Sequence, residues 1–177
     1  MSAQSTWTSK QDNCSSPIKL FRTSSAMPTI LLPVKNQPQH STGDCLAACA
    51  AMALDYIGVS IAYSRLLRLL DVQSYGTPGS RLNRLTALDV HVHYAHGTID
   101  LLVDALTDKH PGIVLLRTSY LPYWTYATDH AVLVIGFDER DFYVNDPAFE
   151  QAPQRIPRAA FELAWMEFDY RYAMIWR

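Results

Sequence analysis

The chain has 177 residues, of which 49% are hydrophobic and 18% are charged, a composition typical of a soluble globular protein with one core. The formal net charge of −2 provides no basic field that would draw the protein to nucleic acid or to an anionic membrane, so neither is an expected partner. Three cysteines, Cys14, Cys45 and Cys49, form no disulfide framework, and the sequence shows neither a signal-peptide pattern nor an apolar stretch of about 20 residues. We therefore expect a cytoplasmic protein with reduced thiols and no membrane span.

The first segment of the chain differs from the rest in composition. Residues 1–26 are rich in serine, threonine, lysine and glutamine and show no sustained periodicity, which is typical of a flexible, disordered leader. An apolar run begins shortly after Met27, so we expect one domain over residues 27–177. Met27 is also a candidate for the start used in the cell, and the sequence leaves that question open.

Helical periodicity dominates the first half of this domain. Asp44 is placed to cap a helix from about Cys45 to Ile57, and Gly58 suits the end of that helix. Its many alanines allow close packing, so we expect a central helix that is buried on most sides. Further helices are predicted over residues 61–72, 81–88 and 99–109, with a strand over residues 89–95.

In the second half the pattern changes to short β-branched and aromatic runs separated by turns, which is typical of strands. These runs cover residues 112–118, 130–139, 141–146 and 169–177. Pro157 opens one further helix before the last of them. The sequence therefore predicts an α+β domain in which an N-terminal helical part packs on a C-terminal antiparallel sheet.

Four side chains could together form a site for acyl transfer. Cys45 lies at the N-terminus of the first helix, where a thiolate is favoured, and His130 stands at the head of an apolar strand, from which it could take the thiol proton. Asp146 ends the next strand, so it could accept the ring N–H of His130 across a hairpin. The amide of Gln39 could join the backbone N–H of Cys45 around a tetrahedral oxyanion.

Two motifs carry a resemblance to a known family. They are "QHSTGDC" followed by "LAACAAMALDYIG" at residues 39–58, and "HAVLVIGFDERDFYVNDPA" at residues 130–148. Together they resemble the C39 peptidases, papain-like cysteine proteases best known as domains that trim double-glycine leaders from bacteriocin precursors. The resemblance covers about residues 34–148.

The resemblance implies a papain-like fold and a role for each residue of the site. Gln39 would be the oxyanion-hole donor, Cys45 the nucleophile, His130 the base and Asp146 the residue that orients the base. The implied chemistry needs no cofactor and no metal, and the implied partner is a peptide or protein substrate.

The chain departs from the family pattern in two respects. Leu46 follows the cysteine where the family usually has glycine, and we expect it to reshape the groove beside the thiol. The exporter-linked members are fused to membrane and nucleotide-binding domains, whereas this chain has no transmembrane run and no GxxxxGK loop. It therefore resembles a stand-alone relative.

Several of these residues also have a purely structural interpretation. A cysteine on an alanine-rich helix is most often core filler, but the surrounding constellation favours catalysis for Cys45, whereas Cys49 is expected in the core. His91 and His93 share one face of a strand, a spacing seen in some metal sites but more often a solvated face, so we expect no metal there. The aromatic loop of residues 119–129 could cover the sheet edge or form a wall of a substrate cleft, and both interpretations stay open.

The site supports three hypotheses about function. The leading one is a thiol peptidase that hydrolyses a peptide bond through an acyl-enzyme on Cys45. The second is an acyl transferase, similar to transglutaminases, which would form the same thioester and pass the acyl group to an amine. The third is a module that binds a peptide without cleaving it. The sequence leaves the substrate, any activating partner and the oligomeric state open.

Overall fold

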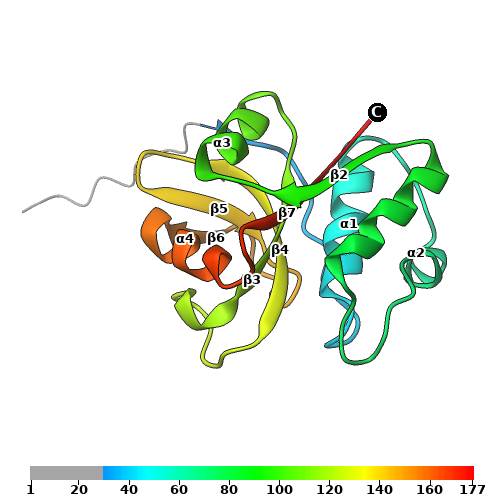
Figure 1. Ribbon diagram of the computed structural model, residues 1–177, viewed down its shortest axis with the longest axis horizontal. Helices are drawn as coiled ribbons and strands as arrows, with labels where there is room; N and C mark the ends of the chain where they lie inside the picture. The colour runs from blue at the N-terminus through cyan, green and yellow to red at the C-terminus, as the bar shows by residue number, and fades with distance from the viewer. Residues whose placement is uncertain (1–29) are drawn as a thin grey trace, which may run out of the picture.

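The structure of the protein is a computed structural model that describes residues 30–177. The predicted leader of residues 1–26, Cys14 and the predicted domain start at Met27 lie outside the described residues. Within the described part, helices and one antiparallel sheet pack together (Figure 1), as the α+β prediction required. Between residues 30 and 177, none of the helices combines the length and the apolar character needed to cross a bilayer.

The sheet has seven strands, with the order β2-β7-β3-β4-β5-β6 and with β1 paired to β4 beside this path. The strands are β1 (Ile30–Leu31), β2 (His91–His96), β3 (Gly112–Arg117), β4 (Asp129–Phe137), β5 (Asp141–Asn145), β6 (Gln154–Pro157) and β7 (Arg171–Trp176). All of the strand pairs are antiparallel. The C-terminal strand β7 lies between β2 and β3, so the last strand of the chain joins a strand of the mainly helical half to the centre of the sheet.

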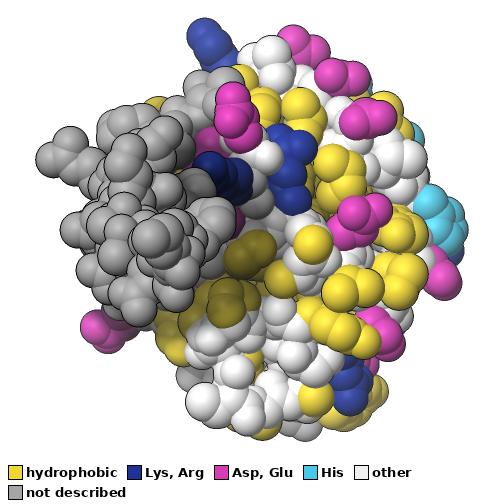
Figure 2. Space-filling view, turned by 90° about the vertical axis from the view of Figure 1, so that its left-hand side faces the viewer, with side chains coloured by type: hydrophobic (Ala, Val, Ile, Leu, Met, Phe, Trp, Pro, Cys, Tyr) yellow, Lys and Arg dark blue, Asp and Glu magenta, His cyan; other side chains and the backbone are white. Residues whose placement is uncertain are grey.

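The helices are α1 (Cys45–Tyr56), α2 (Tyr63–Leu70), α3 (Ile99–Thr107) and α4 (Arg158–Met166), with 3₁₀ helices η1 (Gly79–Leu88) and η2 (Thr118–Tyr120). In Figure 1, α1 and α2 lie on one side of β3 and β4, and α4 lies on the other. Every residue of β4 after Asp129 is buried, which is expected for a strand that is covered on both faces. On the described part of the face over α4, acidic, basic and apolar side chains are interspersed (Figure 2).

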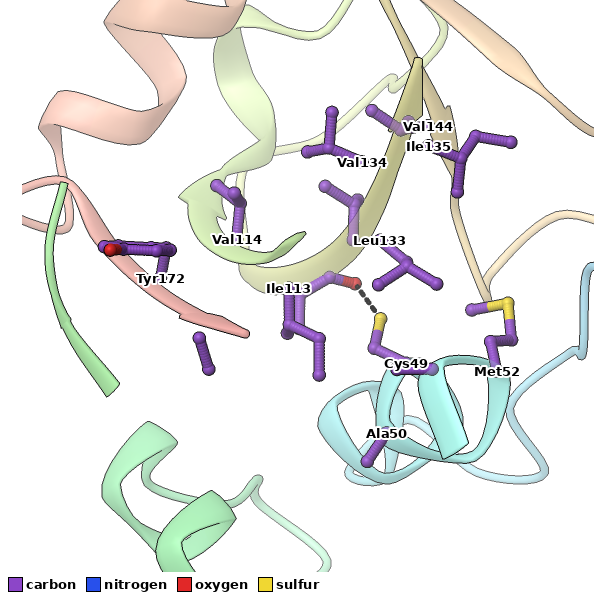
Figure 3. Packing of buried hydrophobic residues seen from close by; sticks show 14 of the residues in the cluster. Cys49, Ala50, Met52, Ile113, Val114, Leu133, Val134, Ile135, Val144 and Tyr172 are labelled. Carbon is purple, nitrogen blue, oxygen red and sulfur yellow. Dashed lines mark hydrogen bonds between the residues drawn. The ribbon is translucent and has the colours of Figure 1, made fainter. Parts of the chain in front are cut away.

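Helix α1 is the central buried helix that the sequence predicts. It begins at Cys45 and ends at Tyr56, followed by Gly58 with a φ of +76°, a conformation that glycine adopts without strain. Its small alanines bring the helix close to the sheet. Figure 3 shows Cys49 and Met52 pointing from α1 toward the strands, with the Cys49 thiol hydrogen bonded to a carbonyl oxygen of β4.

Two features of the fold differ from the sequence prediction. The strands β1 and β6 were not predicted, because one is two residues long and the other is an edge strand that ends in a proline. The strand predicted over residues 89–95 is present as β2, but its pairing along its whole length with β7, from the other end of the chain, was not predicted. Pairing between such distant segments leaves no local signature in the sequence.

Candidate active site

Cys45 is the first residue of α1, and it is partly exposed although the next five residues of the helix are buried. The backbone N–H groups in the first turn of an α-helix have no partner within the helix, and they give this end a partial positive charge. Both effects favour an anionic sulfur at this position over one in the middle of the helix.

Asp44 precedes Cys45, but it does not cap α1 as the sequence predicts. Its carboxylate makes no hydrogen bond to the helix. It instead accepts from the backbone N–H groups of His40 (3.2 Å) and Ser41 (2.9 Å) and from the hydroxyl of Tyr63 (2.9 Å). The reason is the backbone of Asp44, with φ −109° and ψ 18°, which lies outside the extended region that a capping residue normally adopts. Asp44 therefore stabilises the loop before the helix and makes no side-chain hydrogen bond to the first-turn N–H groups beside Cys45.

His130 and Asp146 meet at the open end of the β4–β5 hairpin. Leu133 pairs with Asn145, the last residue of β5, so the next residue of the chain continues toward the beginning of β4. There the Nε2 atom of His130 lies 2.7 Å from Oδ1 of Asp146. His130 is 6% exposed and Asp146 is fully buried. The contact between His130 and Asp146 that the sequence predicts across this hairpin is present in the structure.

Four groups of the described chain donate to the Asp146 carboxylate. His130 and the backbone N–H of Ala148 (2.9 Å) bind Oδ1, and the Tyr123 hydroxyl (3.0 Å) and the Trp124 indole N–H (2.9 Å) bind Oδ2. Burial by itself would raise the pKa of Asp146, but the hydrogen bond and charge of His130, together with the hydrogen bonds from Ala148 and Trp124, outweigh it and lower that pKa. Asp146 is therefore a carboxylate at neutral pH.

The imidazole of His130 holds its proton strongly in this environment. Burial would lower the pKa of His130, but the hydrogen bond and charge of Asp146, together with the nearby Cys45 sulfur, raise it to about 9. Because Nε2 faces Asp146, the nitrogen that remains for Cys45 is Nδ1. The arrangement therefore places a proton-carrying imidazole between a buried carboxylate and a thiol.

Cys45 and His130 line the same cleft, which has a volume of about 580 Å³. Its walls also include residues 75–79, residues 127–129 and Phe168. Tyr75, at the rim, is 87% exposed. A cleft of this size, open to solvent, can admit a segment of extended peptide beside the thiol.

Gln39 lies close to this centre, but its amide does not face the cleft. Its backbone N–H donates to the carbonyl of Pro147 (2.8 Å), which ties it to the residue after Asp146. Its side-chain Nε2 donates to the carbonyl of Ser41 (2.9 Å), and its Oε1 is buried without a hydrogen-bond partner among the described residues. Ser41 is only two residues away, so its carbonyl is the nearest acceptor that the turn offers. The structure therefore brings together Cys45, His130 and Asp146, and the role of Gln39 as an oxyanion donor stays a prediction.

The remaining sequence predictions for this region have clear outcomes. Cys49 is fully buried and its thiol donates to the carbonyl of Ala131 (3.3 Å), so its assignment to the core is confirmed. Leu46 is 1% exposed but is among the residues that line the cleft, so the expectation that it reshapes the groove beside the thiol stays a prediction. His91 and His93 are exposed on the edge strand β2, where His91 stacks on Trp176 and His93 makes an edge-to-face contact with Tyr172.

Sequence reasoning missed the part that Tyr123 and Trp124 play. The aromatic loop of residues 119–129 does line the cleft through its last residues, but its two central rings bind the carboxylate behind His130. The density of aromatic residues directly before a candidate base was the available signal. It could not identify the acceptor, because Asp146 lies more than 20 residues further along the chain.

Comparison with known proteins places the chain in a family context. The pattern of the Peptidase_C39 like family matches residues 31–173, which is most of the chain. A search of curated proteins found no match.

Solved structures with the same fold include three of particular interest. A C39-like peptidase candidate from Bacillus anthracis has a TM-score of 0.72 and 18% identity, covering 86% of this chain and 98% of that chain. A double glycine motif protease from an AMS/PCAT transporter, solved in complex with the leader peptide, has a TM-score of 0.64 and 18% identity over 83% of this chain and 94% of its own. The peptidase domain of Streptococcus ComA, a bi-functional ABC transporter, has a TM-score of 0.63 and 18% identity over 80% and 97% of the two chains. These similarities establish the papain-like fold of C39 peptidase domains.

Proposed function

Because the chain belongs to the Peptidase_C39 like family, we propose that it is a cysteine peptidase that cleaves a peptide bond through an acyl-enzyme on Cys45. The observation that supports this most strongly is the convergence of three side chains at one cleft. Cys45 is at a helix N-terminus and shares the cleft with His130, which is held in turn by the buried Asp146. The proposed substrate is a peptide or a protein.

In the proposed resting state the proton that Cys45 would carry as a thiol lies on Nδ1 of His130, so the pair is a thiolate and an imidazolium. The sulfur attacks the scissile carbonyl carbon, and the carbonyl oxygen becomes an oxyanion. As this tetrahedral intermediate collapses, the C–N bond breaks and the imidazolium protonates the leaving amine. His130, with a pKa raised to about 9, is suited to carry that proton at neutral pH.

The second half of the reaction reverses these roles. The neutral imidazole takes a proton from water, and the resulting hydroxide attacks the thioester carbon. The C–S bond breaks, the product acid leaves, and the proton stays on His130 beside the free thiolate. Asp146 keeps the imidazole oriented with Nε2 away from the substrate throughout both halves.

The oxyanion needs donors that are in place before the charge develops. The backbone N–H of Cys45, at the positive end of α1, is the first candidate. The Gln39 side chain is the second, and it can take this role only if its amide turns from Ser41 toward the cleft. The tie between the Gln39 backbone and Pro147 keeps that side chain within reach of the catalytic hairpin.

A peptide screen tests the proposal. The wild-type protein is incubated with a peptide library that includes sequences with two glycines before the scissile bond, because one structural relative is a double glycine motif protease. New termini are identified by mass spectrometry. The same screen uses Cys45→Ala as the inactive variant and Cys49→Ala as the matched control on the same helix.

We expect cleavage products from the wild type and from Cys49→Ala, and none from Cys45→Ala. Addition of a primary amine separates hydrolysis from acyl transfer, because an acyl transferase would give an amide in place of the free acid. Peptide binding without any product from the wild type would contradict the proposal and favour a non-cleaving module.

A further inference from the structure

The loop that carries Tyr123 and Trp124 has a shape fixed by its own hydrogen bonds. Thr118, at its base, is fully buried, and its Oγ1 accepts from the N–H of Thr128 and donates to the carbonyl of Tyr126, both at 2.8 Å. The backbone N–H of Thr118 also donates to the carbonyl of Thr128 (3.0 Å). The two ends of the loop are therefore joined, and the rings at its centre have a defined position.

Both central rings direct their polar group at the same atom. The Tyr123 hydroxyl lies 3.0 Å and the Trp124 indole nitrogen 2.9 Å from Oδ2 of Asp146, the oxygen that does not contact His130. The rings also pack against Phe149, with centroid distances of 5.2 and 5.3 Å. Trp124 in addition lies 5.0 Å from the His130 ring, measured between centroids. The carboxylate is therefore enclosed on the side opposite the cleft.

The kinds of donor involved restrict the protonation state of this carboxylate. An indole N–H and a backbone N–H can only donate; the Trp124 indole N–H donates to Oδ2 of Asp146, and the backbone N–H of Ala148 donates to Oδ1. A proton on either oxygen would meet a group that cannot accept it. On the Oδ2 side only the Tyr123 hydroxyl could rotate and accept a hydrogen bond from a protonated carboxyl group. The Trp124 contact therefore restricts the protonation of Asp146 more than the Tyr123 contact does.

The same contacts restrict rotation of the carboxylate group. With Oδ2 held by two donors, Oδ1 has one orientation, and that orientation faces Nε2 of His130. We infer that Trp124 and Tyr123 are positioning residues that hold Asp146 ionised and aimed at His130, so that the imidazole presents Nδ1 to Cys45. A role of the two rings in catalysis rests on the proposed function. Their effect on Asp146 and His130 does not depend on any substrate.

The other titratable groups near this centre are few. Cys45 faces His130 from α1, and Cys49, one turn further along the helix, interacts electrostatically with Tyr123. Burial is the largest factor that raises the pKa of Tyr123, followed by the charge of Asp146 and the hydrogen bond to it, so the hydroxyl keeps its proton and remains a donor. Removal of the Trp124 indole N–H or of the Tyr123 hydroxyl therefore takes one hydrogen bond away from Asp146 and adds no charge.

The test measures the titration of the His130 ring by NMR in the full chain, without substrate. Trp124→Phe and Tyr123→Phe each remove one donor and keep an aromatic ring. Two matched control variants remove an indole N–H or a tyrosine hydroxyl that does not contact Asp146. Trp165→Phe removes an indole N–H that binds the carbonyl of Arg171 (2.8 Å), and Tyr143→Phe removes a hydroxyl that binds Asp138 (2.8 Å).

We expect the His130 midpoint, near 9 in the wild type, to fall by about one pH unit in Trp124→Phe, which is a tenfold loss of proton affinity. The fall should be smaller in Tyr123→Phe and largest in the double variant. The rate of Cys45 alkylation at neutral pH should decrease in the same order. Both controls should keep the wild-type midpoint and alkylation profile, even where they lower the melting temperature.

An unchanged His130 midpoint in both Tyr123→Phe and Trp124→Phe would overturn the inference. If Trp124→Phe does not fold, Tyr123→Phe decides alone, because it removes a single oxygen atom. Failure of the proposed function has a different signature: His130 would titrate as expected and respond to the loop variants, while the wild type would cleave no peptide.

Discussion

Two cysteines lie one turn apart on α1, and they occupy opposite chemical environments. Cys45 begins the helix, is partly exposed and shares the cleft with His130. Cys49 is fully buried, and its thiol donates to the carbonyl of Ala131, the residue directly after that histidine. Burial, followed by the nearby Cys45 and Asp146 groups, raises the pKa of Cys49 well above its ordinary value. The two thiols therefore face neighbouring residues of one strand, one at its open end and the other in the core.

The comparison shows that position along a helix and a strand, more than residue type, determines what a cysteine can do. A helix N-terminus supplies unpaired N–H groups and a partial positive charge, and the start of a strand supplies a side chain at the rim of the sheet. One turn further, both advantages are gone and only desolvation remains. Each of the following predictions changes the surroundings of one of the two cysteines, or the cysteine itself.

The largest expected effect is that of Cys45→Ala. Without the sulfur no thioester can form, so peptide cleavage should be abolished, a loss of about 10⁶-fold in kcat by analogy with other nucleophile deletions. The measurement is the rate of product formation on a peptide that the wild type cleaves. Cleavage by Cys45→Ala at more than a trace level would show that another group is the nucleophile.

The next effect is that of His130→Ala, which removes the proton carrier but leaves the thiol. We expect kcat/KM to fall by about 10²- to 10⁴-fold, the usual contribution of general acid–base catalysis. His93→Ala is the matched control, because His93 is exposed on β2 and remote from the cleft. Equal losses in the two variants would mean that His130 acts only through stability.

The pH dependence of stability gives the third prediction. The folded protein binds the His130 proton more tightly than the unfolded chain, since the pKa rises from 6.5 to about 9 on folding. The resulting stabilisation is fully present below pH 6.5 and is lost as the pH rises through about 9. We expect the free energy of unfolding to decrease across this range by up to about 3 kcal/mol more in the wild type than in His130→Gln.

Urea unfolding at both ends of this pH range measures how far the free energy of unfolding falls with pH, which is the slope compared here. His93→Gln should keep the wild-type slope. Asp146→Asn should reduce this pH dependence, because it removes the Asp146 hydrogen bond and charge that help to raise the pKa of His130. A slope in His130→Gln equal to that of the wild type would contradict the assignment of the pKa near 9 to this residue.

The smallest effect on activity is expected from Cys49→Ala. The substitution removes one buried sulfur and its hydrogen bond to Ala131, so the free energy of unfolding should decrease by about 1 to 2 kcal/mol. The rate of peptide cleavage should stay within about threefold of the wild type, because catalysis depends on the other thiol. Thermal denaturation and the cleavage assay together check this result. A loss of activity without a loss of stability would assign Cys49 a part in catalysis.

Part of the candidate site could be predicted from the sequence, because the contact between His130 and Asp146 lies within one hairpin. Two apolar runs joined by a short turn are enough to place His130 near Asp146, and the alanine-rich helix pattern is enough to place Cys45 at a helix N-terminus. The α+β fold class follows from the same change of periodicity. The catalytic roles themselves stay predictions until activity is measured.

The remaining features depend on contacts between distant segments or on the shape of a single turn. Asp44 matches the sequence pattern of a helix cap, but the turn before it rotates its carboxylate toward His40 and Ser41. The contacts of Tyr123 and Trp124 with the Asp146 carboxylate require a loop that is closed at its base and an acceptor on a later hairpin. Neither arrangement leaves a periodic or compositional signal.

The most direct test of the contrast between the two thiols is competitive alkylation. The native protein is exposed briefly to sub-stoichiometric iodoacetamide over about pH 5 to 9, and the adducts are located by peptide mapping. We predict rapid labelling of Cys45 on the acidic side of neutrality, almost none of Cys49, and loss of the rapid labelling in His130→Ala. If Cys45 reacts no faster in the wild type than in His130→Ala, the folded protein contains no activated thiol and the central claim is wrong.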